Sequence, residues 1–302
     1  MKKITIILLL SISFTTVQAC EICGCGLGNY YVGLLPQFKH NFLGLRYQHR
    51  QFHTVMAENT SQYSKDYFST VELWGGWNIG KKWQVLAILP VNFIHQVSDD
   101  GVTNQKGVGD IAVMANYKLW EKNGSSAKGK QLQQQIWIGG GIKLPTGQFN
   151  VDAADPALVS IANTQTGSAS VDYMINGMYD LRINKWGINT SLSYKLNAAN
   201  KDKYSFGDKF TAQSILSYKI QKGNSIVMPN LGLQLEHSSA NQLDKQIIAA
   251  TGGHVFSTAI GIEWNYKKIT LGANLQKPLA QNLSDKQTTL NYRGMAHLTY
   301  SF

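Results

Sequence analysis

The sequence has little charge, few prolines and no long hydrophobic run after its first residues. Charged residues make up 15% of the 302 positions, whereas soluble domains average about a quarter. Only six prolines occur, and no second apolar run reaches the roughly 20 residues of a membrane-spanning helix. With 28 glycines and 11% aromatic residues, this composition is typical of a transmembrane β-barrel. A secreted β-sandwich or β-helix would share part of it.

The start of the chain has the features of a signal peptide. Two lysines precede an apolar stretch at 4–14, which is too short to span a bilayer. Val17-Gln18-Ala19 then presents small or apolar residues at the positions that a signal peptidase reads. The chain is therefore expected to be exported. The predicted division is a cleaved signal peptide at 1–19, a periplasmic cysteine-rich segment at 20–37 and an outer-membrane β-barrel at 38–302.

Apolar and polar residues alternate through most of the mature chain. In "GDIAVMANYKLW", residues 109–120, Ile111 and Val113 fall on one face, and Asp110 and Asn116 on the other. This period of two predicts a strand with one apolar face. The segments with this pattern are 40–52, 66–79, 82–97, 109–120, 133–144, 168–184, 186–197, 209–221, 225–238, 253–266, 268–278 and 289–302. The predicted fold is all-β, a transmembrane antiparallel barrel of about twelve strands, since an even number closes without an open edge.

The connections between these segments alternate in length. The turns "IGKK", "NK", "QKGN" and "YKK" are short, and the connections at the other end, such as 145–167, are long. One connection on the short side, 121–131, is an exception. Outer-membrane barrels have short periplasmic turns and long external loops. The alternation therefore predicts a barrel located in the outer membrane, with both termini in the periplasm. The connection 145–167 is expected outside the cell, where it folds into the mouth of the barrel.

Two stretches carry a family resemblance. The final "HLTYSF" resembles the terminal signature that bacterial outer-membrane barrels offer to their assembly machinery. "GVGDIAVMANYKL" followed by "GGGIKLPTG" resembles the outer-membrane transporters of the MetA pathway of phenol degradation, which are distantly similar to FadL-type barrels. The resemblance implies a porin-like transporter of a Gram-negative outer membrane and names no cargo. The start "CGCGLGNYYVGLLPQF" departs from the family pattern and indicates a cysteine-rich variant.

If the apolar faces meet lipid, the opposite faces supply charged residues to the lumen. Charges of both signs can pair across a narrow interior and fill it, or they can line a polar conduit that orients a small solute. Both interpretations remain open from the sequence. The charged residues predicted to line the lumen are Arg46, Glu72, Asp110, Lys143, Asp172, Asp180, Arg182, Glu236, Glu263 and Arg293.

All three cysteines lie within six positions, just before the first strand. Cys20, Cys23 and Cys25 can converge on one copper(I) or zinc ion, because thiolates are soft ligands. A disulfide is the second interpretation, since the periplasm is oxidising and Cys20 and Cys23 have the spacing of a redox pair. Lipidation of Cys20 is the third, and it would leave two free thiols. No cofactor other than such a metal is expected.

The predicted function is passage of a small solute across the outer membrane, with a link to copper or zinc traffic as a narrower form. The alternative is a non-transporting barrel whose loops serve adhesion or envelope structure. A lipid hydrolase is less favoured, because only His237 with nearby serines could supply a site on the outer wall. We therefore expect no enzyme. The expected partners are outer-membrane lipid and lipopolysaccharide, the barrel assembly machinery and a small-molecule or metal cargo, with no nucleic acid.

Overall fold

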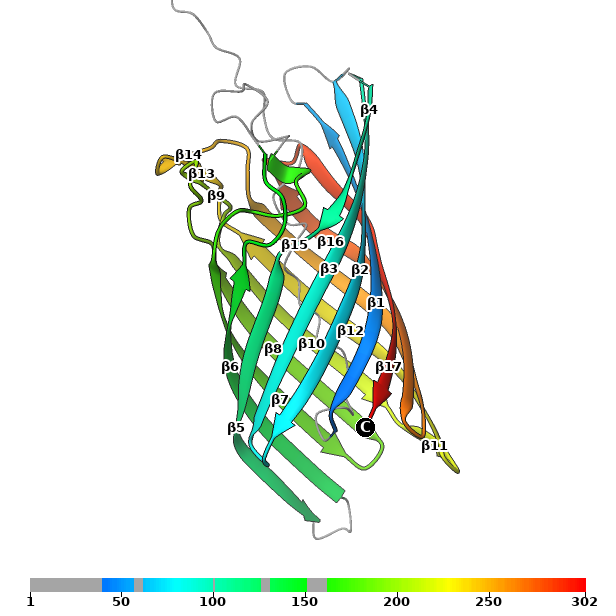
Figure 1. Ribbon diagram of the computed structural model, residues 1–302. Helices are drawn as coiled ribbons and strands as arrows, with labels where there is room; N and C mark the ends of the chain where they lie inside the picture. Colours follow the sequence, from blue (N-terminus) through cyan, green and yellow to red (C-terminus); the bar gives the residue numbers. More distant parts are fainter. Residues whose placement is uncertain (1–39, 57–61, 100, 126–130, 151–161) are drawn as a thin grey trace, which may run out of the picture.

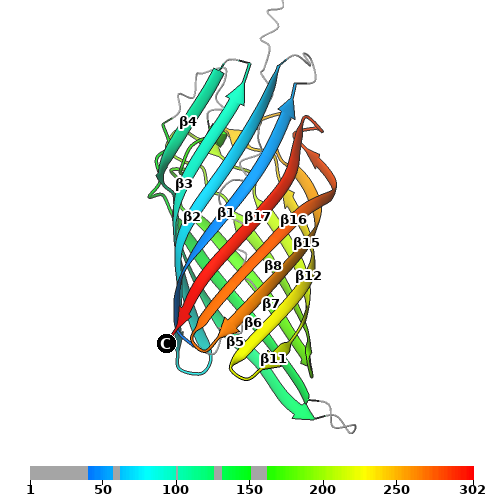
Figure 2. The same ribbon diagram turned by 90° about the vertical axis from the view of Figure 1, so that its right-hand side faces the viewer.

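The computed structural model describes residues 40–56, 62–99, 101–125, 131–150 and 162–302. One antiparallel sheet of fourteen strands curls into a closed barrel (Figures 1 and 2). Two of these strands, β4 and β11, are short additions, so twelve strands form the wall. The predicted fold class and strand number are confirmed. No helix in the described ranges is long and apolar enough to cross a membrane.

The wall strands follow the chain around the barrel. They are β1 (Phe42–Val55), β2 (Tyr63–Ile79), β3 (Trp83–Ser98), β5 (Ile111–Ser125), β6 (Gln131–Leu144), β7 (Asp172–Ile183), β8 (Trp186–Leu196), β10 (Lys209–Tyr218), β12 (Ser225–Ser238), β15 (Gly253–Tyr266), β16 (Ile269–Leu283) and β17 (Thr288–Ser301). The short additions are β4 (Gly101–Val108) and β11 (Ile220–Lys222).

The first and last wall strands close the barrel. β1 pairs with β17 in antiparallel register from Phe42 opposite Ser301 to Thr54 opposite Thr288. Figure 2 shows the two strands side by side along their length. Closure leaves neither β1 nor β17 with an open edge of N–H and C=O groups, which lipid could not satisfy.

Alternate residues of each strand face opposite sides of the wall. In β1, Leu43, Leu45 and Tyr47 are 45%, 53% and 46% exposed, whereas Arg46 and Gln48 are 2% and 7% exposed. The apolar side chains therefore point outward to the position of lipid, and the polar side chains point into the lumen. This inversion of a soluble core is the arrangement expected of a membrane barrel.

The barrel has a turn end and a loop end. The turn end carries the short connections 80–82, 184–185, 223–224 and 267–268 together with the C-terminus. The loop end carries the longer connections, above all 145–171. The connection at 121–131 is largely strand, because β5 and β6 remain paired as far as Ser125 opposite Gln131. Their hairpin projects beyond the other turns (Figure 2).

The loop predicted at 98–108 is instead a strand. β4 pairs with the loop-end half of β3, and β5 pairs with the turn-end half, so the two successively cover the same strand. Gly109 lies at the break between them, where its N–H donates to the Pro90 carbonyl at 2.8 Å. Most residues of β4 are exposed on both faces, so its sequence has no alternation to reveal it.

The strand predicted from residue 168 begins later, at Asp172. Ala169 has a φ of 53°, which is outside the extended region, and the preceding residues turn inward. Two other loop-end connections contain a small separate sheet of β9 (Tyr204–Ser205), β13 (Gln242–Leu243) and β14 (Gln246–Ile247). Phe149, Ala162 and Tyr204 pack into one hydrophobic cluster, which joins the loop 145–171 to this sheet.

Candidate functional site: the barrel lumen

The structure brings most of the predicted lumen residues together inside the barrel. Asp180 and Arg182 lie on β7 toward the turn end, where they pair at 3.0 Å and are partly exposed. The other eight are each at most 7% exposed, namely Arg46, Glu72, Asp110, Lys143, Asp172, Glu236, Glu263 and Arg293. Buried charges in a membrane protein need partners, and these residues are arranged in pairs and clusters.

One ion pair and one histidine–carboxylate contact lie in the turn-end half of the lumen. The Arg46 guanidinium donates to Glu72, which also accepts a hydrogen bond from Gln48 at 3.0 Å. His297 Nε2 lies 3.0 Å from Glu263 Oε1. These partners come from adjacent or nearby strands, so each pair follows from the strand register. Such pairs fill the lumen and fix side-chain positions.

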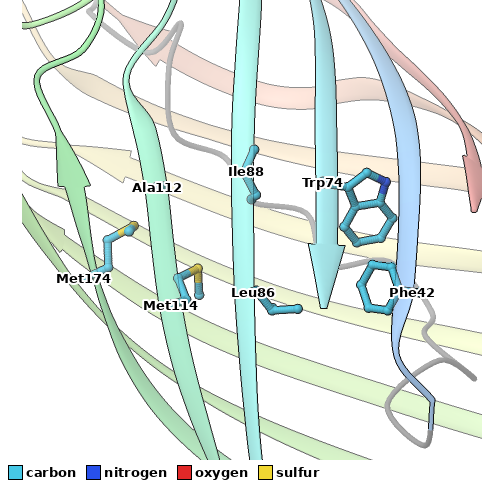
Figure 3. Close-up of a cluster of buried hydrophobic side chains, with 7 residues drawn as sticks. All are labelled: Phe42, Trp74, Leu86, Ile88, Ala112, Met114 and Met174. Atoms are coloured by element: carbon cyan, nitrogen blue, oxygen red, sulfur yellow. The ribbon is translucent and has the colours of Figure 1, made fainter. Parts of the chain in front are cut away.

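A hydrophobic cluster adjoins these pairs inside the barrel. Phe42 and Trp74 pack edge to face with ring centroids 4.8 Å apart. Figure 3 shows them on one side of the cluster, with Met114 and Met174 on the other. Its members are Phe42, Trp74, Leu86, Ile88, Ala112, Met114 and Met174. The lumen is therefore not uniformly polar, although the sequence pattern predicted its polar residues.

Lys143 is held between two buried carboxylates near the loop end. Its Nζ lies 2.6 Å from Asp110 Oδ2 and 2.8 Å from Asp172 Oδ2, and all three side chains are at most 2% exposed. Asp172 also lies 3.4 Å from Lys195 Nζ. The β6–β7 register sets Lys143 directly opposite Asp172, and Asp110 immediately precedes β5 on the other side.

The same carboxylates hold the loop 145–171 in the mouth. Asp110 accepts hydrogen bonds from the Ser168 N–H at 3.0 Å, the Ser168 hydroxyl at 2.8 Å and the Gly147 N–H at 2.9 Å. Residues 162–166, 168 and 170 are buried. Asn92 donates to the Thr166 carbonyl at 3.1 Å, which ties the loop to β3. The described part of this loop therefore folds into the barrel mouth.

A second cluster surrounds Glu236 on β12. Arg293 donates to its two carboxylate oxygens at 2.8 Å and 3.2 Å, and Gln234 donates a third hydrogen bond. Lys209 Nζ lies 3.9 Å from the carboxylate. Arg293 also donates to Gln276 at 3.1 Å. Glu236 on β12 and Arg293 on β17 are 57 positions apart in the sequence, and they meet because the sheet curves around the lumen between these strands.

Several small cavities remain between these side chains. One of about 80 Å³ is lined by Lys195, Arg293 and many amides and thioethers. Another, of about 30 Å³, lies beside Lys143 and the buried loop, and a third of about 10 Å³ lies beside Lys209. The smallest is about the size that one water molecule needs. The lumen thus combines tight packing with polar spaces.

Two features of the lumen were not predicted. Lys209 is 7% exposed and faces inward. The sequence could have indicated this, because Lys209 alternates with the outward-facing Phe210 at the start of its strand. The second feature is sulfur, because the methionines of the wall strands are all buried. They are Met114, Met174, Met178, Met228 and Met295. The sequence positions of single methionines do not show whether a methionine side chain lines a lumen or fills a hydrophobic core.

The predicted cysteine site lies outside the described residues, as do the proposed signal peptide and the segment 20–37. Within the ranges that the structure describes, no three histidine, cysteine, aspartate or glutamate residues gather to hold a metal. His237 lies on the lipid-facing side of β12, where the register sets it beside Phe210 and His254. The nearby Ser238 hydroxyl donates to the Ser239 carbonyl at 3.4 Å.

Comparisons with known proteins agree with this architecture. A family model described as "Putative MetA-pathway of phenol degradation" matches residues 47–292. None of the curated proteins matches the chain. An outer membrane channel from Pseudomonas putida F1 is similar with a TM-score of 0.60 and 14% identity, over 87% of this chain and 96% of that chain. The β-domain of the Bordetella autotransporter BrkA has a TM-score of 0.49 and 12% identity, over 87% of this chain and all (100%) of that chain.

At such identities the similarity to the Pseudomonas putida channel establishes the fold alone, that of an outer-membrane β-barrel. The family model begins after the cysteine-rich segment, so the variant predicted there stays a prediction. The family model nevertheless spans nearly the whole barrel. The chain therefore belongs to the family of the MetA pathway of phenol degradation.

Proposed function

We propose that this barrel is an outer-membrane channel for a small solute, and that the described parts of the loop 145–171, residues 145–150 and 162–171, control the opening of its lumen. The observation that carries the proposal is how this loop is held. Inside the mouth its described parts are fixed by side-chain hydrogen bonds to Asp110 and Asn92 and by packing of Phe149 and Ala162 against Tyr204, while the strand ladder of the wall is complete without them. A segment held in this way can leave the mouth without breaking the barrel. A barrel that served only adhesion would have no need of the polar cavities behind it.

Excision of the loop tests this proposal. Gly147 and Gly167 lie in backbone contact, and the Gly167 N–H donates to the Gln148 carbonyl at 2.9 Å. Residues 148–166 can therefore be removed and Gly147 joined to Gly167 with little displacement of the wall. In planar bilayers we expect the shortened protein to conduct more than the full chain, with heat-modifiable gel mobility retained by both. Absence of conductance and of solute uptake by liposomes in both forms would favour the non-transporting alternative.

The proposal includes an orientation and a set of partners. The turn end, with the C-terminus, is placed in the periplasm, and the loop end outside, because short turns face the periplasm in barrels of this type. The exposed aromatic residues Trp83, Trp186, Trp264 and Tyr300 form a band at the turn end, as expected at a lipid–water boundary. Outer-membrane lipid, lipopolysaccharide and the barrel assembly machinery are the partners that this orientation requires.

A narrower form of the proposal links the channel to soft metals through Cys20, Cys23 and Cys25. It is supported by the close spacing of the three thiols. Reduced protein should bind about one copper(I) or zinc ion, and joint replacement of Cys23 and Cys25 by serine should abolish this while the barrel still assembles. Mass spectrometry of the mature N-terminus is the companion measurement. An acylated Cys20, a native disulfide, or undiminished uptake by the double variant would exclude the three-thiolate site.

A further inference from the structure

Eight charged side chains form a connected belt inside the barrel toward the loop end. In order of ion pairing or strand register the charged belt runs Asp110, Lys143, Asp172, Lys195, Lys209, Glu236, Arg293 and Arg50. Five of these residues are basic and three are acidic. Around most of the belt the signs alternate, and oppositely charged groups lie 2.6–3.9 Å apart. The alternation breaks at two places.

At each break, two positive residues stand directly opposite each other on neighbouring strands. Lys195 of β8 pairs in register with Lys209 of β10, and Arg50 of β1 pairs in register with Arg293 of β17. Directly opposed residues share a face, and like charges at such positions destabilise a sheet. In these two pairs both residues face the lumen, where water screens their repulsion poorly. An anion between them would relieve that repulsion.

Lys209 carries the sharpest evidence at the first break. Its side chain is 9% exposed, and its Nζ has no hydrogen-bond partner among the described residues. The nearest carboxylate, Glu236, is 3.9 Å away, and its oxygens already accept hydrogen bonds from Arg293 and Gln234. A buried ammonium without a hydrogen-bond acceptor is costly. The Lys209 ammonium instead borders the cavity of about 10 Å³ beside Glu236 and Arg293.

The two breaks border one larger cavity. Lys195 from the first break and Arg293 from the second both line the cavity of about 80 Å³. No carboxylate is among its described lining residues. The rest of the lining includes amide and hydroxyl groups, the aliphatic side chains of Ile175 and Leu192, and four methionine thioethers, from Met114, Met174, Met178 and Met295. Thioethers are apolar and adaptable, and they pack well against aromatic or aliphatic groups.

We propose that the lumen selects small organic anions, whose charged group is held between the basic pairs of the charged belt while their apolar body lies against the methionines. This inference rests on the proposed channel function and gives it a substrate class, a small carboxylate. Lys195 and Arg293, which line the cavity, contact the anionic group, and Lys209 and Arg50 stand directly opposite them on the neighbouring strands and strengthen the positive field there. Neutral and cationic solutes of the same size lack the group that these residues hold.

Binding to the detergent-solubilised protein is the first test, since it requires no conduction. Calorimetric titration should detect benzoate, whereas benzyl alcohol should bind more weakly and benzylamine should not bind. Lys209→Gln should weaken benzoate binding about tenfold, because it removes a buried positive charge directly opposite Lys195. The matched control is Lys277→Gln, which removes the same charge from the exposed face of β16. Heat-modifiable mobility establishes that both variants are assembled.

The second test measures ion selectivity in planar bilayers, with the loop-excised form as the conducting protein. Chloride and benzoate should permeate in preference to potassium, and the double variant Lys195→Gln with Lys209→Gln should reduce this preference about tenfold. Lys277→Gln should leave it unchanged.

The two tests separate the site from the channel. Benzoate binding that depends on Lys209, in a protein that never conducts, would support the anion site and reject the channel. Conduction without anion preference, together with benzoate binding that is absent or equal in Lys209→Gln, would retain the channel and overturn the anion site. Equal binding of benzoate and benzylamine would also overturn it.

Discussion

Replacement of Lys143 by glutamine should loosen the loop end without dissolving the barrel. The side chain is 2% exposed, and its ammonium lies 2.6 Å from Asp110 and 2.8 Å from Asp172. At these separations, and with an effective dielectric constant of about 20, each attraction amounts to roughly 6 kcal/mol. Desolvation offsets most of this gain, but removal of one partner from a buried ion pair still costs about 3–5 kcal/mol, because the other charge is left uncompensated.

The matched control is an exposed ion pair on a neighbouring strand. Lys118 lies 2.9 Å from Glu121, with side chains 18% and 33% exposed. Lys118→Gln should cost at most about 1 kcal/mol, because water screens such pairs. Urea titration of the heat-modifiable band measures both variants. Proteinase K should cleave the loop 145–171 faster in Lys143→Gln, because Asp110 also anchors the loop through Ser168 and Gly147. Equal urea midpoints and equal cleavage rates for the two variants would refute this account of the cluster.

Two further predictions concern the register and the orientation. Leu192 is 50% exposed on the lipid-facing side, and Ser191 faces the lumen. Leu192→Asp should therefore destabilise the assembled barrel by up to about 2–4 kcal/mol, and Ser191→Asp should be tolerated, as judged by heat-modifiable mobility. Equal damage from the two substitutions would refute the register. An epitope tag beside Lys245 at the loop end should bind antibody on intact cells, whereas one at Gly223 should require a permeabilised outer membrane; the reverse result would invert the orientation.

Much of the wall could be predicted from the sequence because lipid imposes a strict alternation on each strand. β12 and β15 have the bounds that the pattern predicted, 225–238 and 253–266. The prediction failed where neither face meets lipid. β4 is exposed on both faces, so nothing in its composition separates it from a loop. At 168–171 the serines alternate as a strand would, yet they turn inward because Asp110 and Asp172 accept their hydrogen bonds.

The candidate site was predictable residue by residue but not as an arrangement. Alternation indicates that Lys143 and Asp172 face the lumen, and it says nothing of their pairing, which follows from the β6–β7 register. The sequence likewise does not show which basic residues stand opposite each other and repel. That Lys195 stands opposite Lys209, and Arg50 opposite Arg293, depends on the pairing of β8 with β10 and on closure of β1 against β17.

A list of inward charges therefore supports two opposite conclusions, a neutralised and packed lumen or a charged conduit. The register decides between them locally. Where opposite signs meet, as at Lys143, the charges neutralise each other and the carboxylates hold the loop in place. Where like signs meet, as at Lys195 and Lys209, the two directly opposed residues repel each other although Asp172 and Glu236 lie nearby, and a mobile anion between them would lower that repulsion. The selectivity of this barrel is thus expected to reside at the two breaks of the charged belt, and its closure at the paired segment between Asp110 and Asp172.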